Sequence, residues 1–215
     1  MLKEKALFVT FEGIEGSGKS YQSKILFKNL LKEKMPVILT REPGGTRSAE
    51  KIRNLILEDY FHPELKEKFN KCTDTLLYLA ARNEHVTNLI KPALAKKKIV
   101  ICDRFTDSTL AYQVYGKGVN RNLINSVHKH ILKDLMPDLT FILTVNIATA
   151  MLRLKKRKKK NRYDKFSRKF YTNVQNAFLK LAKKNKKRYV VIDNSHDSKD
   201  VEKVIFETIK ERFKR

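Results

Sequence analysis

Hydrophobic and polar positions along the chain follow two different periods, one typical of buried strands and one typical of helices. Short runs of Val, Ile, Leu and Phe that end at polar or turn residues predict strands. These runs lie at residues 7–11, 37–40, 99–102, 139–145 and 189–193. Between them, apolar residues recur every three or four positions, which predicts helices. The predicted helices cover residues 19–34, 48–57, 73–95, 107–115, 121–135, 148–157, 165–183 and 201–213.

The order of these segments predicts the fold class. Apolar strands that alternate with helices are typical of an α/β domain, here a five-stranded parallel sheet with helices on both faces. Ligands of such sheets bind beyond the carboxyl ends of the strands. Polar clusters follow the strands at residues 7–11, 37–40 and 99–102. We therefore expect these clusters to meet at one edge of the sheet.

Length and composition fit one domain over residues 1–215, because the chain is 41% hydrophobic and shows no linker or internal repeat. No apolar stretch approaches the roughly 20 residues that span a bilayer. The first residues also lack the apolar core of a signal peptide. Cys72 and Cys102 are far apart, without metal-ligand spacing, so we expect no disulfide framework. Together these features predict a cytoplasmic protein.

The chain is strongly basic, with 47 Lys and Arg against 23 Asp and Glu and a net charge of +24. Such a charge can indicate a nucleic acid or a membrane surface as partner. A general lysine bias is the alternative. Lysines are spread over nearly every predicted helix, and the densest run, at 154–160, contains no aromatic residue to stack on bases. We therefore expect no membrane partner and regard nucleic acid as unlikely, although the field would attract anionic nucleotides.

The first predicted strand leads into a phosphate-binding loop, EGIEGSGKS at residues 12–20. Backbone N–H groups of its glycines can approach a polyphosphate because no Cβ is in the way, and the next helix adds its positive end. We expect Lys19 to reach the outer phosphates and the Ser20 hydroxyl to ligate Mg²⁺. A chance glycine-rich turn is the alternative, which the strand–loop–helix context argues against. The predicted ATP-binding residues are Gly13, Ile14, Glu15, Gly16, Ser17, Gly18, Lys19 and Ser20.

A second group of residues could hold a small nucleotide beside the first. Tyr78 and Arg82 lie four positions apart on one helix face, where a ring could stack on a base and a guanidinium could bond its edge. Tyr78 could equally be an ordinary core residue. Residues 103–113 combine a carboxylate, a guanidinium, hydroxyls and an amide. Helix capping explains some of these groups, but it does not explain Arg104 and Gln113 together.

These motifs together resemble bacterial thymidylate kinase, a family of P-loop nucleoside monophosphate kinases. The resemblance runs from about residue 7 to residue 193, in the same order. It rests on FEGIEGSGKS at 11–20, TREPGGT at 40–46, LY-x3-R at 77–82, DRFTDSTLAYQ at 103–113 and PDLT at 137–140. The resemblance implies transfer of the ATP γ-phosphoryl group to dTMP, with Mg²⁺ as cofactor and a two-fold homodimer.

The resemblance also implies roles for residues at the acceptor nucleoside. Glu15 matches the acidic residue that contacts the 3′-hydroxyl. Tyr78 matches the aromatic residue, usually Phe, that stacks on thymine, and Arg82 matches the residue that bonds the pyrimidine edge. Tyr112 matches the aromatic residue that disfavours a 2′-hydroxyl.

Further matches concern the phosphates and the walls of the pocket. Arg104 matches the arginine at the acceptor phosphate, and Asp103 lies where a carboxylate helps to organise Mg²⁺. The Glu42–Pro43 bond matches a turn that is often cis. Residues that complete the expected substrate-binding set are Arg41, Ser108, Thr109 and Gln113.

Phosphoryl transfer brings two polyanions together, so it needs cations. The basic segment at residues 153–168 is the expected lid, and the resemblance implies that its arginines supply charge to the transition state. Arg157 and Arg162 are the predicted catalytic arginines, together with Lys19 and Arg104, and Arg153 is the third choice in the lid. We expect the lysines at 158–160 to be merely solvated.

Some positions depart from the family pattern. Thr144 stands where the fourth strand usually ends in Asp, and Asn161 replaces a common Asp in the lid. Two other functions remain open. One is a nucleoside monophosphate kinase with a different base preference, since small pocket changes shift selectivity by only about 1–3 kcal/mol. The other is a nucleic-acid-binding ATPase that uses the basic surface.

Overall fold

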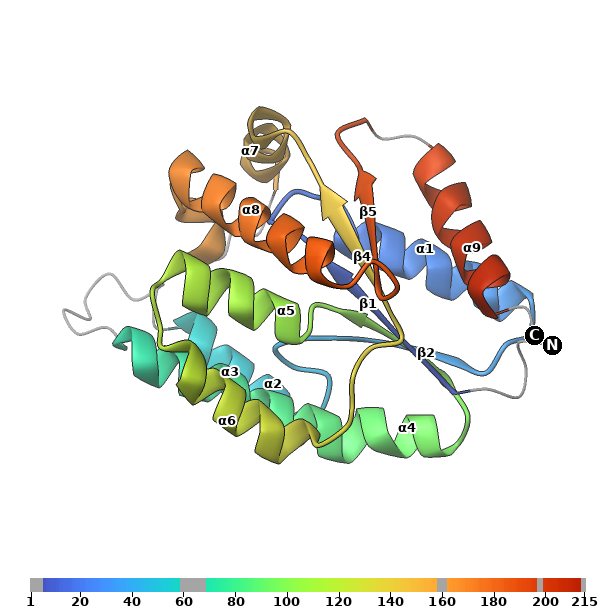
Figure 1. Ribbon diagram of the computed structural model, residues 1–215, viewed down its shortest axis with the longest axis horizontal. Helices are drawn as coiled ribbons and strands as arrows, with labels where there is room; N and C mark the ends of the chain where they lie inside the picture. The colour runs from blue at the N-terminus through green and yellow to red at the C-terminus, as the bar shows by residue number, and fades with distance from the viewer. Residues whose placement is uncertain (1–5, 59–68, 158–161, 197–198, 214–215) are drawn as a thin grey trace.

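The structure is a computed structural model that describes residues 6–58, 69–157, 162–196 and 199–213. Its centre is a five-stranded sheet with the strand order β2-β3-β1-β4-β5, in which every neighbouring pair is parallel (Figure 1). The α/β prediction is therefore confirmed, and each predicted strand agrees with the observed one to within a residue. The strands are β1 (Leu7–Glu12), β2 (Val37–Arg41), β3 (Ile99–Asp103), β4 (Leu139–Thr144) and β5 (Tyr189–Asp193).

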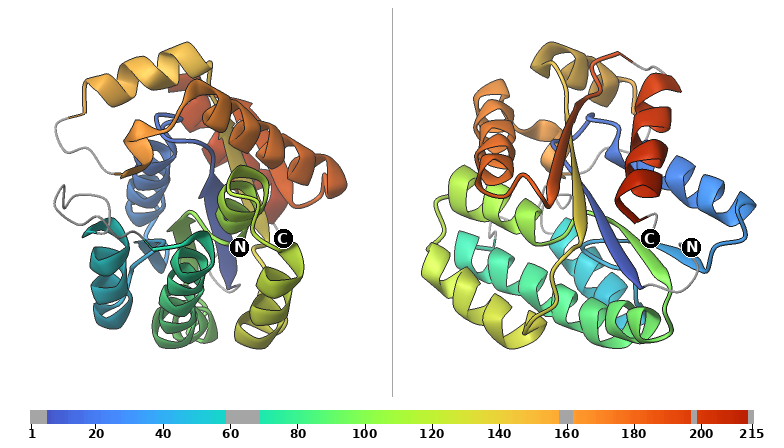
Figure 2. Two further views of the ribbon diagram at one scale, coloured as in Figure 1. Left: turned by 90° about the vertical axis from the view of Figure 1, so that its left-hand side faces the viewer. Right: turned by 45° about the vertical axis from the view of Figure 1, so that its right-hand side comes forward.

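Helices cover both faces of this sheet (Figures 1 and 2). One face carries α1 (Lys19–Lys32) and α9 (Lys199–Phe213), which pack on the same cluster of strand residues. The remaining α-helices are α2 (Arg47–Glu58), α3 (Lys71–His85), α4 (Lys91–Ala95), α5 (Thr106–Thr109), α6 (Arg121–Leu132), α7 (Ile147–Lys155) and α8 (Arg168–Lys184). No described helix is long and apolar enough to cross a membrane.

Alternation along β1 explains why two layers of helix are needed. Leu7, Val9 and Phe11 pack in the cluster under α1 and α9, whereas Phe8 packs in a separate cluster with residues of α4 and α6. Successive strand side chains point to opposite faces, so a central strand that is buried along its whole length has to be covered on both sides.

Two predicted helices contain π-helical turns that periodicity did not predict. Residues 71–95 form one helical run in which η2 (Val86–Ile90) joins α3 to α4. Pro92 lies in the first turn of α4, where its missing N–H is tolerated. Likewise, η3 (Leu110–Gly116) continues α5. Single π-helical turns within α-helices are frequent at functional sites.

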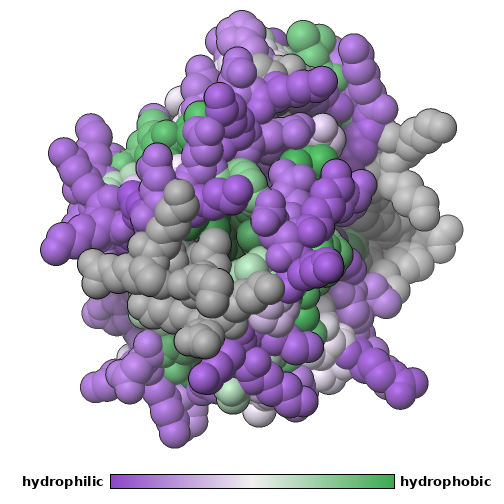
Figure 3. Space-filling model, turned by 90° about the vertical axis from the view of Figure 1, so that its right-hand side faces the viewer, coloured by the Kyte–Doolittle hydropathy of each residue, from purple (hydrophilic) through white to green (hydrophobic). Residues whose placement is uncertain are grey.

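The carboxyl ends of the strands bring the polar motifs together, as expected. Asp103, at the end of β3, pairs in register with Phe11 of β1 on one side and with Arg41 of β2 on the other. The left view in Figure 2 looks toward this edge, with α7 on one side of it and α2 and α3 on the other. On the opposite side of the molecule, hydrophilic residues cover most of the surface (Figure 3).

Candidate functional site

A cleft of about 1270 Å³ lies at the carboxyl edge of the sheet. Lys19, Arg82 and Arg104 line this one cleft, so the two nucleotide subsites predicted from the sequence are contiguous. The other predicted site residues that line it are Glu15, Gly16, Gly18, Ser20, Arg41, Tyr78, Asp103, Ser108, Thr109, Tyr112, Gln113 and Arg157. Gly13, Ile14 and Ser17 are predicted ATP-binding residues that lie buried in the loop itself.

The phosphate-binding loop is closely packed, which explains its glycines. Gly16 has φ +75°, and a Cβ there would lie 2.8 Å from the Ala150 carbonyl oxygen of α7. Gly18 has φ +85° and is the N-cap of α1, so the positive end of that helix faces the loop. The buried Ser17 Oγ has no hydrogen-bond partner among the described residues. The loop can therefore offer both backbone and side-chain donors to an anion.

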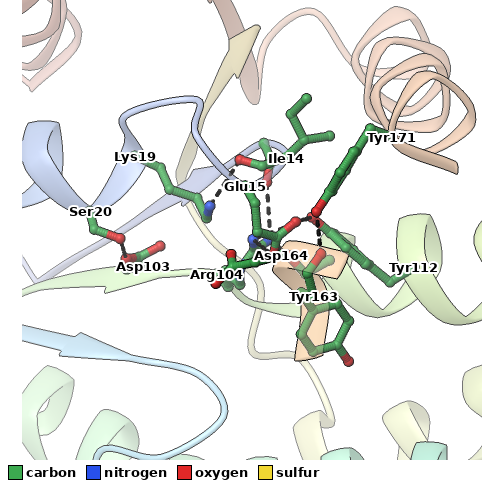
Figure 4. Close-up of polar contacts among 12 residues, drawn as sticks. Ile14, Glu15, Lys19, Ser20, Asp103, Arg104, Tyr112, Tyr163, Asp164 and Tyr171 are labelled. Carbon is green, nitrogen blue, oxygen red and sulfur yellow. Dashed lines mark hydrogen bonds and ion pairs between the residues drawn. The ribbon is translucent and has the colours of Figure 1, made fainter. Parts of the chain in front are cut away.

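Lys19 is buried at the wall of the cleft. Its Nζ donates a hydrogen bond to the Ile14 carbonyl oxygen at 3.1 Å (Figure 4). Burial, and to a lesser extent the charge of Arg104, lowers the pKa of Lys19 to about 8, although nearby carboxylates oppose the shift. An anion bound in the loop would offer this ammonium group a stronger partner than a backbone carbonyl.

Ser20 and Asp103 supply oxygen atoms at the mouth of the loop. The Ser20 hydroxyl donates to Asp103 Oδ2, and the buried Oδ1 of Asp103 has no partner among the described residues (Figure 4). Hydroxyl and carboxylate oxygens suit Mg²⁺, which also keeps water and phosphate ligands and so needs few protein groups. The pair therefore fits a metal held jointly with a nucleotide.

Arg104 connects the loop to the second subsite. Its guanidinium donates to the Gly13 carbonyl oxygen at 3.0 Å, to Ser108 Oγ at 3.0 Å and to Glu15 Oε1 at 2.6 Å. Its Cζ also lies 5.0 Å from the centre of the Tyr112 ring. Arg104 has φ +73°, an uncommon conformation that needs support from its surroundings.

Glu12, which the sequence analysis did not select, supports this conformation. Its carboxylate accepts the Phe105 N–H at 2.7 Å and the Ser108 hydroxyl at 2.5 Å. Burial first, and then the nearby Asp107, raises the pKa of Glu12 to about 8. The residue directly precedes Gly13, and that adjacency was the only sequence signal for its role.

Glu15 is the acidic group between the two subsites. One carboxylate oxygen pairs with Arg104, and the other accepts the hydroxyl of Tyr112 (Figure 4). Burial alone would raise the pKa of Glu15, but Arg104 and Lys19 outweigh it and the pKa is lowered. The carboxylate is thus ionised and ready to exchange partners.

Arg82 is more fully engaged with the protein than the sequence suggested. It donates to Glu42 at 2.8 Å, to Thr109 at 2.8 Å and to the Phe105 carbonyl oxygen at 3.1 Å. It also lies 2.7 Å from His128 Nε2. Burial, followed by the charge of Arg82, lowers the pKa of His128 to about 3, so the imidazole is neutral and accepts this bond. A direct bond from Arg82 to a base stays a prediction.

The turn that holds Glu42 has the predicted geometry, because the Glu42–Pro43 peptide bond is cis. The glycine-rich turn also brings Arg41 to the cleft, where its guanidinium pairs with Glu50 at 2.9 Å and is half exposed. Gln113 is buried at the cleft wall. The roles of Arg41 and Gln113 in binding the acceptor stay predictions.

The basic segment gives three different environments to its three candidate arginines. Arg153 donates to the carbonyl oxygens of Gly16, Asn194 and Ser195 at 3.0, 2.9 and 3.2 Å, so it ties the loop to the end of β5. Arg157 lines the cleft, is half exposed and lies 3.3 Å from Asp164.

Arg162 does not occupy the position expected of a catalytic arginine. It starts η4 (Arg162–Lys165), is only 1% exposed and forms an ion pair with Asp74 of α3. A local charge pattern carries no information about such a distant partner, so the sequence could not distinguish Arg162 from Arg157. The prediction for the lysines at 158–160, and the Asn161 departure, lie outside the described residues.

The sheet is parallel and doubly wound, and a phosphate-binding loop follows β1. Basic and aromatic residues line the same cleft as this loop. Together these features are typical of the class of P-loop nucleoside monophosphate kinases. Comparison with known proteins narrows this class. A sequence model described as thymidylate kinase matches residues 11–205, and the chain belongs to the thymidylate kinase family.

Individual relatives agree with this assignment. A Wolbachia pipientis protein named thymidylate kinase is 44% identical over 206 residues, which cover 94% of each chain. An Ehrlichia chaffeensis protein of the same name is 40% identical and covers 93% of this chain and 94% of its own. The crystal structure of thymidylate kinase from Ehrlichia chaffeensis superposes with a TM-score of 0.75 at 36% identity, over 95% of this chain and 99% of that one.

Proposed function

We propose that this chain transfers the γ-phosphoryl group of ATP to dTMP and forms dTDP for DNA precursor synthesis. The observation that carries the proposal is the position of Lys19 and Arg104 in one cleft, with Glu15 between them. One cation lies at the phosphate-binding loop, and the other lies beside the aromatic residues of the second subsite. Membership of the thymidylate kinase family supports dTMP as the acceptor.

In the proposed mechanism, the loop amides and Lys19 hold the ATP phosphates. Arg104 exchanges its bond with Glu15 for the acceptor phosphate, which frees Glu15 to accept the 3′-hydroxyl of the sugar. The ring of Tyr78 stacks on the base, and Tyr112 crowds the sugar. The transition state is loose and highly charged, so positioning and charge neutralisation provide most of the catalysis.

We propose Mg²⁺ as the cofactor, held with the nucleotide by Ser20 and Asp103. When bound, the ion would neutralise phosphate charge. The unpartnered Oδ1 of Asp103 supports this assignment. Asp103→Asn should weaken the Mg²⁺ dependence of nucleotide binding measured by calorimetry, and an unchanged dependence would contradict the role.

A coupled assay for ADP release with dTMP tests the activity. Lys19→Ala and Arg104→Ala should each lose at least about 10²-fold in turnover, since each removes a cation from the transferring or accepting phosphate. Arg121→Ala is the matched control, because Arg121 contacts Tyr115 away from the cleft and should retain activity. Full activity in either of the first two variants would contradict the mechanism.

The same assay distinguishes the competing functions. Preference for dCMP over dTMP and dUMP at one ATP concentration would indicate a kinase with a different base preference. ATP hydrolysis that responds to DNA or RNA, but not to dTMP, would indicate a nucleic-acid-dependent ATPase.

We also propose a cytoplasmic homodimer, in keeping with the family resemblance. Leu55 of α2 and Leu76 of α3 support an interface, because both are apolar, 45% exposed and on adjacent helices. Sedimentation velocity at assay concentrations should show a dimer, and a monomer would contradict this part of the proposal.

A further inference from the structure

Arg162 is held by groups from two other helices of the fold and by its neighbour in the chain. Its guanidinium pairs with Asp74 of α3 and donates to the Ile56 carbonyl oxygen of α2 at 3.0 Å. It also donates to the hydroxyls of Tyr78 at 3.1 Å and Tyr163 at 3.0 Å. The basic segment is therefore attached to the acceptor side of the cleft through one buried side chain.

The charge of Arg162 is already compensated in this position. Its partner Asp74 is 2% exposed, and the second carboxylate oxygen of Asp74 pairs with Lys117 at 2.6 Å. Breaking a buried pair by moving one member is costly, because the other charge is left without a partner. Unlike Arg157, Arg162 is also not among the described residues that line the cleft.

Tyr163, the neighbour of Arg162, does line the cleft. Its ring lies edge-on to Tyr112, with centroids 5.5 Å apart and an interplanar angle of 88°. The ring of Tyr78 lies 6.5 Å away at 66°. Tyr78 and Tyr112 are the rings proposed to contact the base and the sugar, so Tyr163 adds a third aromatic surface to the same end of the cleft.

The hydroxyls of Tyr78 and Tyr163 form a hydrogen bond to each other as well as to Arg162. Burial raises the pKa of both phenols, so both stay neutral and keep their protons for donation. A Phe at position 78 could stack on a base equally well, but it could not make these bonds. The hydroxyl of Tyr78 therefore has a task in this chain besides stacking.

We propose that Arg162 is a positioning residue for Tyr163. Through Asp74 and the paired hydroxyls of Tyr78 and Tyr163, it fixes the ring of Tyr163 as a third wall of the pocket for the acceptor nucleoside monophosphate. The inference rests on the proposed function, which assigns this end of the cleft to the acceptor. It replaces the expected role of Arg162 as a charge donor and leaves that role to Arg157. The consequence is tighter binding of the acceptor rather than faster transfer.

Removal of single hydroxyls tests this arrangement. Tyr78→Phe and Tyr163→Phe should each raise the KM for dTMP, and the Kd for dTMP measured by calorimetry without ATP, by at least about fivefold, since each loses its bonds to the other hydroxyl and to Arg162. The double variant should weaken binding by less than the product of the two single effects, because both single variants already lose the bond between the two hydroxyls. The KM for ATP should not change. Tyr115→Phe is the matched control, since its hydroxyl accepts a bond from Arg121 outside the cleft.

Conservative replacement of Arg162 tests whether this residue positions Tyr163 or supplies charge to the transition state. Arg162→Lys should raise the KM for dTMP at least about tenfold and lower kcat by less than threefold, whereas Arg157→Lys should lower kcat with little change in KM. A large loss of kcat in Arg162→Lys with unchanged KM would overturn the inference. The inference would also be overturned if Tyr78→Phe and Tyr163→Phe bound dTMP normally, or if the effect of the double variant equalled the product of the two single effects.

Failure of this inference is distinguishable from failure of the proposed function. If the unmodified protein turns over dTMP but the Tyr78 and Tyr163 variants behave like Tyr115→Phe, only the inference is wrong. If the unmodified protein does not turn over dTMP, the proposed function is wrong and the inference falls with it.

Discussion

The two central cations of the cleft, Lys19 and Arg104, are largely buried, and each depends on its neighbours. Lys19 is 6% exposed and bonds only weakly to a carbonyl oxygen, whereas Arg104 is held by a carboxylate, a hydroxyl and a ring. The two cations therefore start from different states. Lys19 has a lowered pKa, while nearby acidic groups overcome burial and raise the pKa of Arg104.

Binding of ATP should accordingly take up a proton on Lys19. With a pKa of about 8 in the free protein, part of the Lys19 population is neutral at pH 8, and a bound polyphosphate would favour the charged form. Affinity for ATP should fall as the pH rises above about 8. Calorimetry at pH 8 in buffers of different ionisation enthalpy should show net proton uptake. Lys19→Arg, which stays protonated, should remove this uptake, and uptake that persists would contradict the assignment.

At the scale of elements, α7 contributes to the site in two ways. Arg153, in its last turn, ties the phosphate-binding loop to the end of β5. Arg157, just beyond the helix, faces the cleft with half of its side chain exposed. The helix and the residue just beyond it thus support the loop and place a cation at the cleft.

Variants of α7 should separate these two roles. Arg157→Met should lower kcat by roughly 10²–10³-fold, since it removes charge from the transition state. Arg153→Met should mainly raise the KM for ATP, since Arg153, although it lines the cleft, donates to three backbone carbonyl oxygens and its loss loosens the loop. Lys155→Met, an exposed position on the same helix, is the control. Equal effects of Arg153→Met and Arg157→Met on kcat would contradict the division.

At the scale of the whole molecule, the sheet edge carries one cleft, lined by the proposed subsites for ATP and dTMP, in a protein of net charge +24. The overall charge favours the arrival of nucleotides, but the arrangement of side chains decides where each one binds. ATP and dTMP should therefore each add their own contribution to the free energy of unfolding.

Thermal unfolding should show this separation. A ligand at about 100 times its Kd stabilises the native state by about 2.7 kcal/mol and raises Tm measurably. Arg104→Ala should lose most of the Tm shift with dTMP and keep the shift with ADP and Mg²⁺. Lys19→Ala should show the reverse pattern. If both variants lost both shifts equally, the two subsites would not be independent.

Local pattern was sufficient for most of the fold. The strands were predictable because each is a short apolar run, and the central strand β1 is buried along its whole length. The helices were predictable from the spacing of their apolar residues, but the π-helical turns at Val86–Ile90 and Leu110–Gly116 were not. Such a turn depends on packing against other elements, which period alone does not record.

The candidate site was predictable to the extent that it lies within contiguous motifs. The phosphate-binding loop and residues 103–113 were recognisable because their chemistry is concentrated in few residues. Glu12, Glu42 and His128 were missed, since each acts on residues that are distant in sequence. Glu42 and His128 contact Arg82, and Glu12 accepts hydrogen bonds from Phe105 and Ser108. Nothing near these three residues in the sequence indicates which partners they hold.

The sequence by itself determined the order of strands and helices, the phosphate-binding loop and the family, because these depend on local periodicity and contiguous motifs. The tertiary structure alone decided which basic residues face the cleft. Arg157 and Arg162 are five positions apart in one basic segment, yet one is half exposed at the cleft and the other is buried against Asp74. The difference arises from partners brought by α2 and α3, since the environment of a charge is set by the groups that fold around it.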